Sequence, residues 1–398
     1  MKKERIVSIA IVMLILLLFL TYSPPSTSSQ IGFAFFALSL GALIVELWIL
    51  APSMATIEKR VPLFRKPFFR FFSRKLAFLF VAIFFSFTLL FILPYLMPTN
   101  PVDMMIARVS AGQQDVSRLL AMRNEYIVLF GLDKPLIEQY GLFWKRVLTL
   151  DFGPSIAYNR SVGSLVGQAL VWTLALIIPV LILEFTVGTS LGARVAFSKN
   201  RFLRAIYTFS VYLSSAPYYW FGLILAYIFA VNLRWFPIYG GYSLFVKPSF
   251  SLSFFLDVAY HWVLPFLSLF IAGLGGWCSG MRAMTIYERQ SDYIYYSQQM
   301  GFTRNKLRKY AQRNAILPMI TGVPAMFGSL IGQTMLVEYV FGWPGLGTLL
   351  FGSVQAIDYP LMQGIFVFTV LVVLVGNFLI DILYGFIDPR IRTGYVGG

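Results

Sequence analysis

Long apolar runs separated by short polar segments set the pattern of this chain. Eight of the runs are long enough, or nearly long enough, to cross a membrane as a helix, which takes about 20 residues. They cover residues 6–22, 31–51, 76–97, 165–197, 205–231, 258–281, 319–340 and 361–387. The pattern therefore predicts an all-α integral membrane protein.

The same pattern divides the chain into five parts. Residues 1–75 form a membrane hairpin of two helices that ends in a basic loop, and 76–97 form the first helix of a six-helix core. Residues 98–164 are a polar segment long enough for a small helical cap. Residues 165–387 hold the rest of the core with a polar loop at 282–318, and 388–398 form a tail. The first run is short and follows "MKKER", as in a signal peptide, but no small-residue cleavage motif follows it, which favours an anchor helix.

The positive charges predict how the chain is oriented. If the N-terminus is cytoplasmic and the chain crosses eight times, 23 of the 32 Lys and Arg residues lie on the cytoplasmic side. Seven of the other nine lie in the 98–164 segment, and long external segments follow the positive-inside rule only weakly. We therefore expect both termini and the 282–318 loop to be cytoplasmic, and the 98–164 segment to be external.

Composition and motif content exclude several classes of function. The chain is 58% hydrophobic and 12% charged, and its net charge of +15 resides in short loops rather than in a soluble basic module, so we expect no nucleic-acid partner. It has one cysteine, Cys278, and one histidine, His261, which cannot build a metal site. It also lacks the phosphate-binding G-x-x-x-x-G-K-[ST] loop. We expect neither a catalytic site nor a cofactor in this chain.

The apolar runs contain one acidic residue near mid-membrane and three pairs of glycines. Glu184 is the acidic residue that we place near mid-membrane. An ionisable group at that depth suggests a function by default, and here the function would be ion-coupled secondary transport without an ATPase. Small residues at four-residue spacing predict close helix packing. These pairs are Gly188/Gly192, Gly276/Gly280 and Gly328/Gly332.

The most polar stretch of the second half reads "DYIYYSQQMGFTRNKLRKYAQRNAILP", residues 292–318. After Gly301, apolar and small residues recur at three and four positions, which is one face of a helix, and Arg and Lys cover the remainder. Before Gly301, a shorter helical turn holds Ile294, Ser297 and Met300. The spacing predicts two short cytoplasmic helices with an exposed turn between them. It fits equally well a basic loop held near anionic lipid.

This stretch resembles the cytoplasmic loop of ABC importer permeases of the dipeptide/oligopeptide family. That family carries D-Y-x-x-x-A-x-x-x-G followed by R-N-A-x-x-P. The residues that fit are Asp292, Tyr293, Gly301, Arg313, Asn314, Ala315 and Pro318. Tyr295, Tyr296 and Ser297 replace the E-A-A triplet of the general pattern.

The resemblance extends from about residue 74 to residue 392. "FGLDKPLIEQYGLFWKRVLTLDFGPSI" resembles the external segment of these permeases. "VEYVFGWPGLG" and "DYPLMQG" resemble the external loop before the last helix, and "DILYGFIDPRIR" resembles the C-terminus. The chain is most similar to the B-type subunit of the pair, whereas residues 1–73 lie outside the family pattern.

The resemblance implies a multi-pass cell-membrane subunit that forms half of the pathway of a type I ABC importer. The implied partners are a second homologous permease, two ATPase subunits that bind ATP and magnesium, an extracellular solute-binding protein and membrane lipid. Members of the family carry dipeptides, oligopeptides, nickel or oligosaccharides. By resemblance, the residues that couple this chain to the ATPase are Asp292, Tyr293, Ser297, Gly301, Phe302, Arg304, Arg313, Asn314 and Pro318.

Overall fold

The computed structural model describes residues 67–92, 94, 121, 123–125, 127–128 and 131–387. The two predicted N-terminal spans, 6–22 and 31–51, and the predicted tail lie outside these residues. Within them the regular structure is helical, apart from an isolated antiparallel bridge between Pro154 and Ser161. The helices are α3 (Pro67–Ile92), α6 (Leu136–Thr149), α7 (Val162–Phe197), α8 (Arg201–Leu213), α9 (Tyr218–Leu225), the π-helix η3 (Ala226–Asn232), α10 (Leu252–Arg289), α11 (Asp292–Gln299), α12 (Arg304–Thr321), α13 (Val323–Phe341), α14 (Leu346–Ala356) and α15 (Tyr359–Ile387).

The predicted core spans correspond to helices of the structure, but two of them are bent. Among the residues that the structure describes, 4 single helices are long and apolar enough to cross a membrane, and up to 6 spans result if each bent pair is counted as one. The run at 205–231 is bent by 104° between α8 and α9. Pro217 lies at this break and disfavours helical geometry in the residue before it, so the apolar run does not continue as one helix.

The second bend corrects the prediction for the polar stretch. The helix after Gly301 is not a short separate element, because α12 runs for 18 residues into the apolar run. It then meets α13 at Gly322 with a bend of 53°. Pro318 and Pro324 flank this point, and each lacks the N–H that a continuous helix would use. At the other end of the core, α3 begins at Pro67, so the last part of the predicted basic loop is helical.

The described chain divides into two compact units. In the first, aromatic side chains of α3 pack on α6: Phe84 stacks on Trp144 at 5.6 Å between ring centroids, and Phe91 lies 5.2 Å from Tyr140. The Thr88 and Tyr140 hydroxyls are 2.7 Å apart and hydrogen bonded. The packing of α3 on α6 therefore fixes the helix that precedes the loop at residues 150–161.

The start of α15 is tied to that loop within the same unit. Asp358 stands just before α15 and accepts the Leu361 N–H at 3.2 Å, as a helix N-cap does. Its other carboxylate oxygen accepts the Ser155 hydroxyl at 2.5 Å and the Ala157 N–H at 2.9 Å. One buried carboxylate therefore caps a helix and holds the loop after α6.

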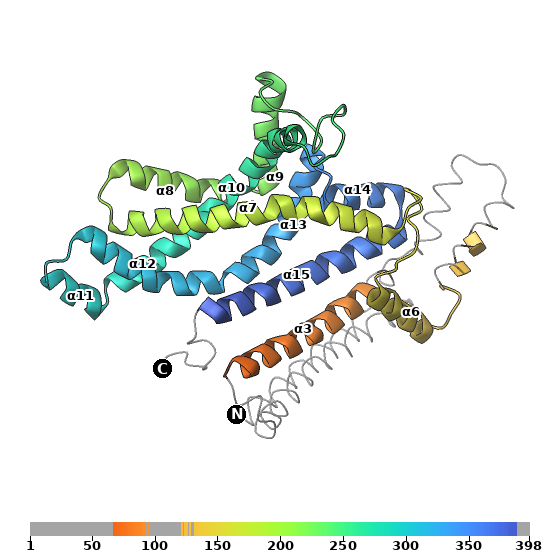
Figure 1. Ribbon diagram of the computed structural model, residues 1–398, viewed down its shortest axis with the longest axis horizontal. Coiled ribbons are helices and arrows are strands. Elements are labelled where there is room, and N and C mark those ends of the chain that lie inside the picture. The colour runs from red at the N-terminus through yellow and green to blue at the C-terminus, as the bar shows by residue number, and fades with distance from the viewer. Residues whose placement is uncertain are drawn as a thin grey trace, which may run out of the picture. The chain divides into compact units, whose positions relative to one another are not determined.

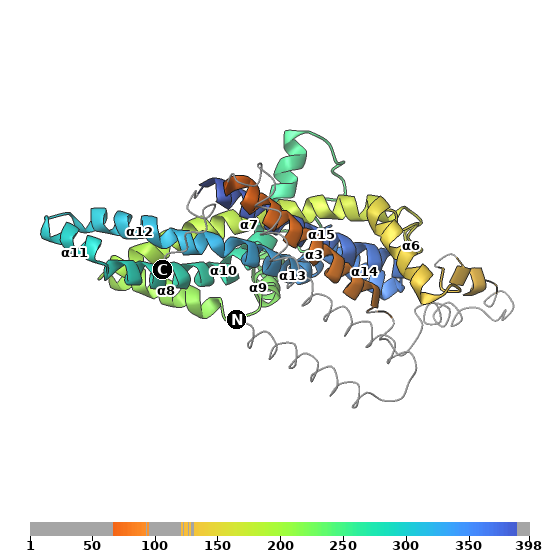
Figure 2. The same cartoon turned by 90° about the horizontal axis from the view of Figure 1, so that it is seen from below.

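The second unit comprises Ser164–Gly352 and Leu379–Tyr384 and is organised around α10. Helices α8, α9, α12 and α13 all contact α10, and α11 with the first turns of α12 lies at one end of the unit (Figures 1 and 2). Gly188 and Gly192 of α7 lie against α10, and a Cβ on Gly188 would come within 2.6 Å of the Trp277 Cβ. The prediction of close packing is confirmed for this pair.

In the other two glycine pairs, three positions can be judged, and they differ. A Cβ on Gly276 or on Gly332 would meet no described atom within 4 Å, so these two positions do not bring helices together. Gly280 does lie against a neighbouring helix, because a Cβ there would come within 3.0 Å of the Met319 Cε atom of α12. Further close approaches of α10 are made by Gly273, which faces the Glu184 carboxyl, and by Gly275, which faces the backbone of Ser210. The four-residue spacing therefore identified some close contacts of α10 and missed others.

Candidate functional site

Helix α11 and the turn that joins it to the start of α12, residues 292–304, are the first candidate, and we call this segment the Gly301 knuckle. Helix α11 ends at Gln299, and Gly301 follows in the left-handed region with φ +79°. The Gly301 N–H donates to the Gln298 carbonyl at 3.0 Å, and the Phe302 N–H donates to the Ser297 carbonyl at 3.2 Å. These two bonds form a Schellman motif, which glycine favours because it has no Cβ. The glycine that the sequence pattern places at position 301 is therefore explained by the backbone conformation of this turn.

The knuckle is held to the ends of two long helices by a small apolar cluster. Its buried members come from α7, α11 and α12, and they are Ala196, Phe197, Ile294, Leu307 and Ala311. Phe302 packs on this cluster from the turn, and Ile286 packs on it from α10. Because burial of apolar side chains is the main force that fixes such contacts, α11 and α12 are attached to α7 and α10 rather than lying free on a membrane surface.

The tip of the knuckle exposes large side chains that the cluster does not use. Tyr295, Tyr296 and Met300 are 59%, 65% and 67% exposed, and the two tyrosine rings are 5.8 Å apart. Tyrosine is enriched among the residues that contribute most to protein–protein binding. These three residues were not among the predicted coupling residues. The signal that could have found them is their position on the helix face opposite Ile294 and Ser297.

The nine sequence-predicted residues fall into two groups. Asp292, Tyr293, Ser297, Gly301, Phe302 and Arg304 lie in the knuckle. Arg313, Asn314 and Pro318 lie farther along α12. At about 1.5 Å per residue, Arg313 is roughly 14 Å along the helix axis from Arg304. The structure therefore does not gather all nine at one surface.

Tyr293 links the two groups. Its hydroxyl donates to Glu288 at 2.5 Å, and its carbonyl accepts the Ser297 hydroxyl at 2.7 Å. Burial raises the pKa of the Tyr293 hydroxyl and the hydrogen bond to Glu288 raises it further, so Tyr293 stays a hydrogen-bond donor. A hydrogen bond with the Asn314 side chain also reaches the Tyr293 hydroxyl and lowers its pKa. Tyr293 and Asn314 thus help to position α11 on α12.

A second turn, residues 338–347, connects α13 to α14 and is called the Glu338 turn here. Glu338 is fully buried and accepts the Gly347 N–H at 2.6 Å, while its own carbonyl accepts the Trp343 N–H at 2.8 Å. The Trp343 indole donates to the Trp172 carbonyl at 3.0 Å. A Cβ on Gly345 would overlap the Glu338 carboxylate. The "VEYVFGWPGLG" motif is therefore a packed turn around a carboxylate, and sequence reasoning missed Glu338.

Glu184, the predicted intramembrane acid, occupies a packed helix crossing. It is 1% exposed and faces Gly273 of α10, where a Cβ would overlap its carboxyl group. Within the described residues its Oε1 atom has no hydrogen-bond partner. Glu184 thus lies between α7 and α10 and is not presented to solvent, and this position gives no support to a role in ion coupling.

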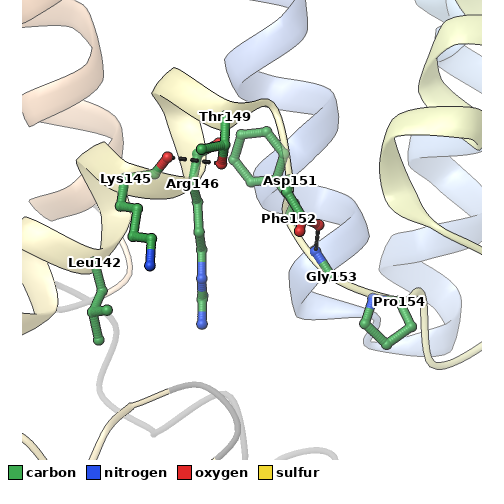
Figure 3. Close-up of a pocket in the computed structure, with 8 residues that line it drawn as sticks. All are labelled: Leu142, Lys145, Arg146, Thr149, Asp151, Phe152, Gly153 and Pro154. Carbon is green, nitrogen blue, oxygen red and sulfur yellow. Dashed lines mark hydrogen bonds between the residues drawn. The ribbon is translucent and has the colours of Figure 1, made fainter.

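An open cavity of about 270 Å³ lies at the C-terminal end of α6, in the segment predicted to be external (Figure 3). Figure 3 shows the Lys145 and Arg146 side chains pointing to the same side of α6. On the adjoining loop, Asp151 accepts the Gly153 N–H at 3.0 Å. This hydrogen bond shapes the loop, and the cavity gathers no set of groups with the geometry of a catalytic or metal site.

Comparison with known proteins places these features in context. Residues 188–393 match the family described as "Binding-protein-dependent transport system inner membrane component". The chain is 35% identical over 277 residues to the oligopeptide transport system permease protein AppB of Bacillus subtilis (strain 168), covering 68% of this chain and 85% of that protein. It is 32% identical over 348 residues to the di/tripeptide transport system permease protein DppB of Pseudomonas aeruginosa (strain UCBPP-PA14), covering 81% and 98%. It is 30% identical over 307 residues to the glutathione transport system permease protein GsiC of Escherichia coli (strain K12), covering 76% and 92%.

Proposed function

The chain belongs to the family of binding-protein-dependent transport system inner membrane components, and from this premise we propose that it is the permease subunit of an ATP-driven peptide importer. Membership makes it a non-catalytic, multi-pass membrane component of an ABC transporter that works with an ATPase and a binding protein. The peptide class follows from the three relatives, which are permeases for oligopeptides, di- and tripeptides, and glutathione. Oligosaccharides are the alternative cargo.

The proposed assembly is a heterodimer of this chain and a second permease, with two ATPase subunits on the cytoplasmic side. The solute-binding protein docks on the external side, on the segment that contains α6. There, Ile137 and Leu148 are 69% and 78% exposed and offer apolar contact area. The charge bias supports this orientation, with both termini and the Gly301 knuckle in the cytoplasm. Labelling from outside at Lys134→Cys, with none at Thr303→Cys, checks the orientation, and Cys278 is buried.

The observation that carries the proposal is the exposed aromatic tip on a fixed turn. Tyr295 and Tyr296 offer a docking surface for the ATPase, while the cluster around Ile294 joins that surface to α7 and α10. ATP-driven movement of the ATPases then shifts the knuckle together with the ends of these two helices. Such a shift switches the permease between inward-open and outward-open states as rigid bodies.

Removal of the tip tests this function. Truncation of a central interface tyrosine costs about 2 kcal/mol or more, which is more than tenfold in affinity. We therefore expect Tyr295→Ala/Tyr296→Ala to lose co-purification with the ATPase and to abolish uptake of labelled peptide by the reconstituted transporter. Tyr158→Ala, a half-exposed tyrosine in the segment predicted to be external, is the control for ATPase binding and should keep co-purification. Normal uptake by the double variant would overturn the docking role.

Peptide transport itself is tested in the same proteoliposomes. The parent complex should accumulate a labelled di- or oligopeptide only when the binding protein and ATP are both supplied. Accumulation of an oligosaccharide instead of a peptide would show that the substrate belongs to the alternative class. Uptake that persists without the ATPase would overturn the importer assignment.

A further inference from the structure

A basic cavity of about 460 Å³ lies beside the knuckle, and neither tyrosine of the exposed tip lines it. Its walls come from the end of α7, the start of α8, the last turns of α10 and the first residue of α12. The lining residues that the argument uses are Lys199, Arg204, Tyr207, Arg282, Arg289 and Arg304. Segments about 100 residues apart in sequence thus bring five cationic side chains to one hollow.

The positive charge of this cavity is not balanced from within. None of its lining residues is acidic, and no ion pair of these five cations occurs in the part of the chain that the structure describes. Glu288, next to Arg289 in sequence, instead accepts the Tyr293 hydroxyl. Like charges gathered in a partly enclosed space repel one another more than in open water, which favours the binding of an anion.

The guanidinium groups are positioned without being neutralised. Arg204 donates to the Ser198 carbonyl at 3.2 Å, and Arg289 donates to the Ala196 carbonyl at 3.4 Å. The Arg282 guanidinium lies 5.0 Å above the Tyr207 ring centroid. These contacts orient the side chains and leave further N–H groups for a ligand. Arginine forks of this kind match the oxygens of a phosphate group.

An apolar surface adjoins the cavity. Val195, Ala196 and Ile286 contribute to its wall. Helix α8, which contributes Arg204 and Tyr207 to the cavity, is half of a candidate membrane span. A ligand in the cavity would therefore meet cations together with an apolar part of the wall, beside a helix that enters the membrane, and this combination suits an amphiphile.

We propose that this basic cavity binds the phosphate group of an anionic phospholipid from the adjacent membrane leaflet. Basic pockets between membrane helices on the cytoplasmic side suit such headgroups. Free phosphate shares the headgroup chemistry but has no use for the apolar part of the wall or for the adjacent membrane. The proposed site shares Arg304 with the edge of the knuckle but does not include the tyrosine tip. Arg204 and Arg282 belong to the cavity alone, so their variants test it separately from ATPase docking.

The test measures lipid binding by the purified full chain. Native mass spectrometry in detergent follows titration with phosphatidylglycerol and, in parallel, with phosphatidylcholine. Each cation near an anionic lipid surface contributes about fivefold in affinity, so Arg204→Gln/Arg282→Gln should weaken phosphatidylglycerol binding by roughly 25-fold. Lys306→Gln/Lys309→Gln removes the same charge from α12 without touching the cavity and should change binding less than about twofold.

Each other result rejects the lipid site. Equal loss in both variant pairs would mean general attraction to charge, and unchanged binding in the first pair would mean that the cavity is not used. Displacement of the lipid by an equal concentration of inorganic phosphate would assign the cavity to free phosphate. Normal lipid binding with loss of the ATPase from Arg204→Gln/Arg282→Gln would assign it to the ATPase interface.

Discussion

The Gly301 knuckle and the Glu338 turn share a backbone device but have opposite surroundings. Each places a glycine at positive φ directly after a helix, +79° at Gly301 and +60° at Gly342. Beside Gly301 no described atom would meet a Cβ within 4 Å, whereas a Cβ on Gly342 would overlap the ring of Tyr239. One turn is surrounded by open space, and the other is filled by the chain's own side chains.

This difference separates residues that serve the fold from residues that serve a partner. In the Glu338 turn, buried hydrogen bonds and close contacts account for the glycines, the tryptophan and the carboxylate. In the knuckle, hydrogen bonds and apolar packing account for Gly301, Ile294 and Phe302. Within the part of the chain that the structure describes, Tyr295 and Tyr296 make no such contribution to the fold. Large aromatic side chains kept exposed in a compact turn indicate a surface for another molecule.

The largest effect is expected from Gly347→Ala in the buried turn. A Cβ at this position would overlap the Met335 backbone, which cannot move aside as a side chain can. We expect a loss of about 2–3 kcal/mol of folding free energy, measured as a lower midpoint of thermal unfolding for the purified chain. Gly276→Ala is the matched control because its Cβ would meet no described atom within 4 Å. Equal stability of the two variants would contradict the packing of the Glu338 turn.

An intermediate effect is expected from Gly301→Asp in the knuckle. Within the described part of this chain, the only cost of the new side chain is the positive φ at position 301, so the free energy of unfolding should fall by about 1 kcal/mol. Binding of the ATPase should weaken at least tenfold, because a side chain would project into the docking surface. Co-purification of the ATPase and peptide uptake are the measurements.

Gly301→Asn sharpens this experiment because asparagine tolerates the left-handed conformation. If Asn and Asp both abolish docking, the partner needs the space beside Gly301. If Asn restores docking, the turn itself is what matters. Normal assembly and transport by Gly301→Asp would remove the knuckle from the coupling role.

The smallest effect is expected from Arg304→Ala at the edge of the knuckle. Its side chain is exposed, and exposed charges contribute little and are screened by salt. ATPase binding should weaken less than about fivefold, and the difference from the parent should shrink as salt is raised. A salt-independent loss as large as that of Gly301→Asp would place Arg304 inside the interface.

The sequence predicted those features of the fold that depend on local pattern. Apolar runs located the core helices, and Gly301 between two helical faces located the knuckle. The 104° bend at Pro217 was hidden because the apolar composition continues through "SSAPYYW" without a polar break. Helix propensity and hydropathy indicate whether a segment is helical and apolar. They do not determine the direction that the chain takes after a break in the helix.

Features built from distant segments could not be read in the same way. Glu338 stands near the end of an apolar run, and nothing local shows that Gly347 returns to it. The attachment of Ile294 to Phe197 joins residues nearly 100 positions apart. The cations of the basic cavity were predicted as loop charges, because their convergence requires the crossing of α7 and α10 through Gly188 and Gly192.

The bend at Gly322 has a mechanical consequence. The 18 residues of α12 form a stiff arm of about 27 Å, with the tyrosine tip near one end and this bend at the other. The cluster around Ile294 clamps the arm to α7 and α10 close to the tip, while α13 continues beyond the joint at an angle of 53°. A torque applied at the tip would therefore turn α7, α10 and α12 as one lever, with Gly322 as the hinge that lets α13 follow a different path.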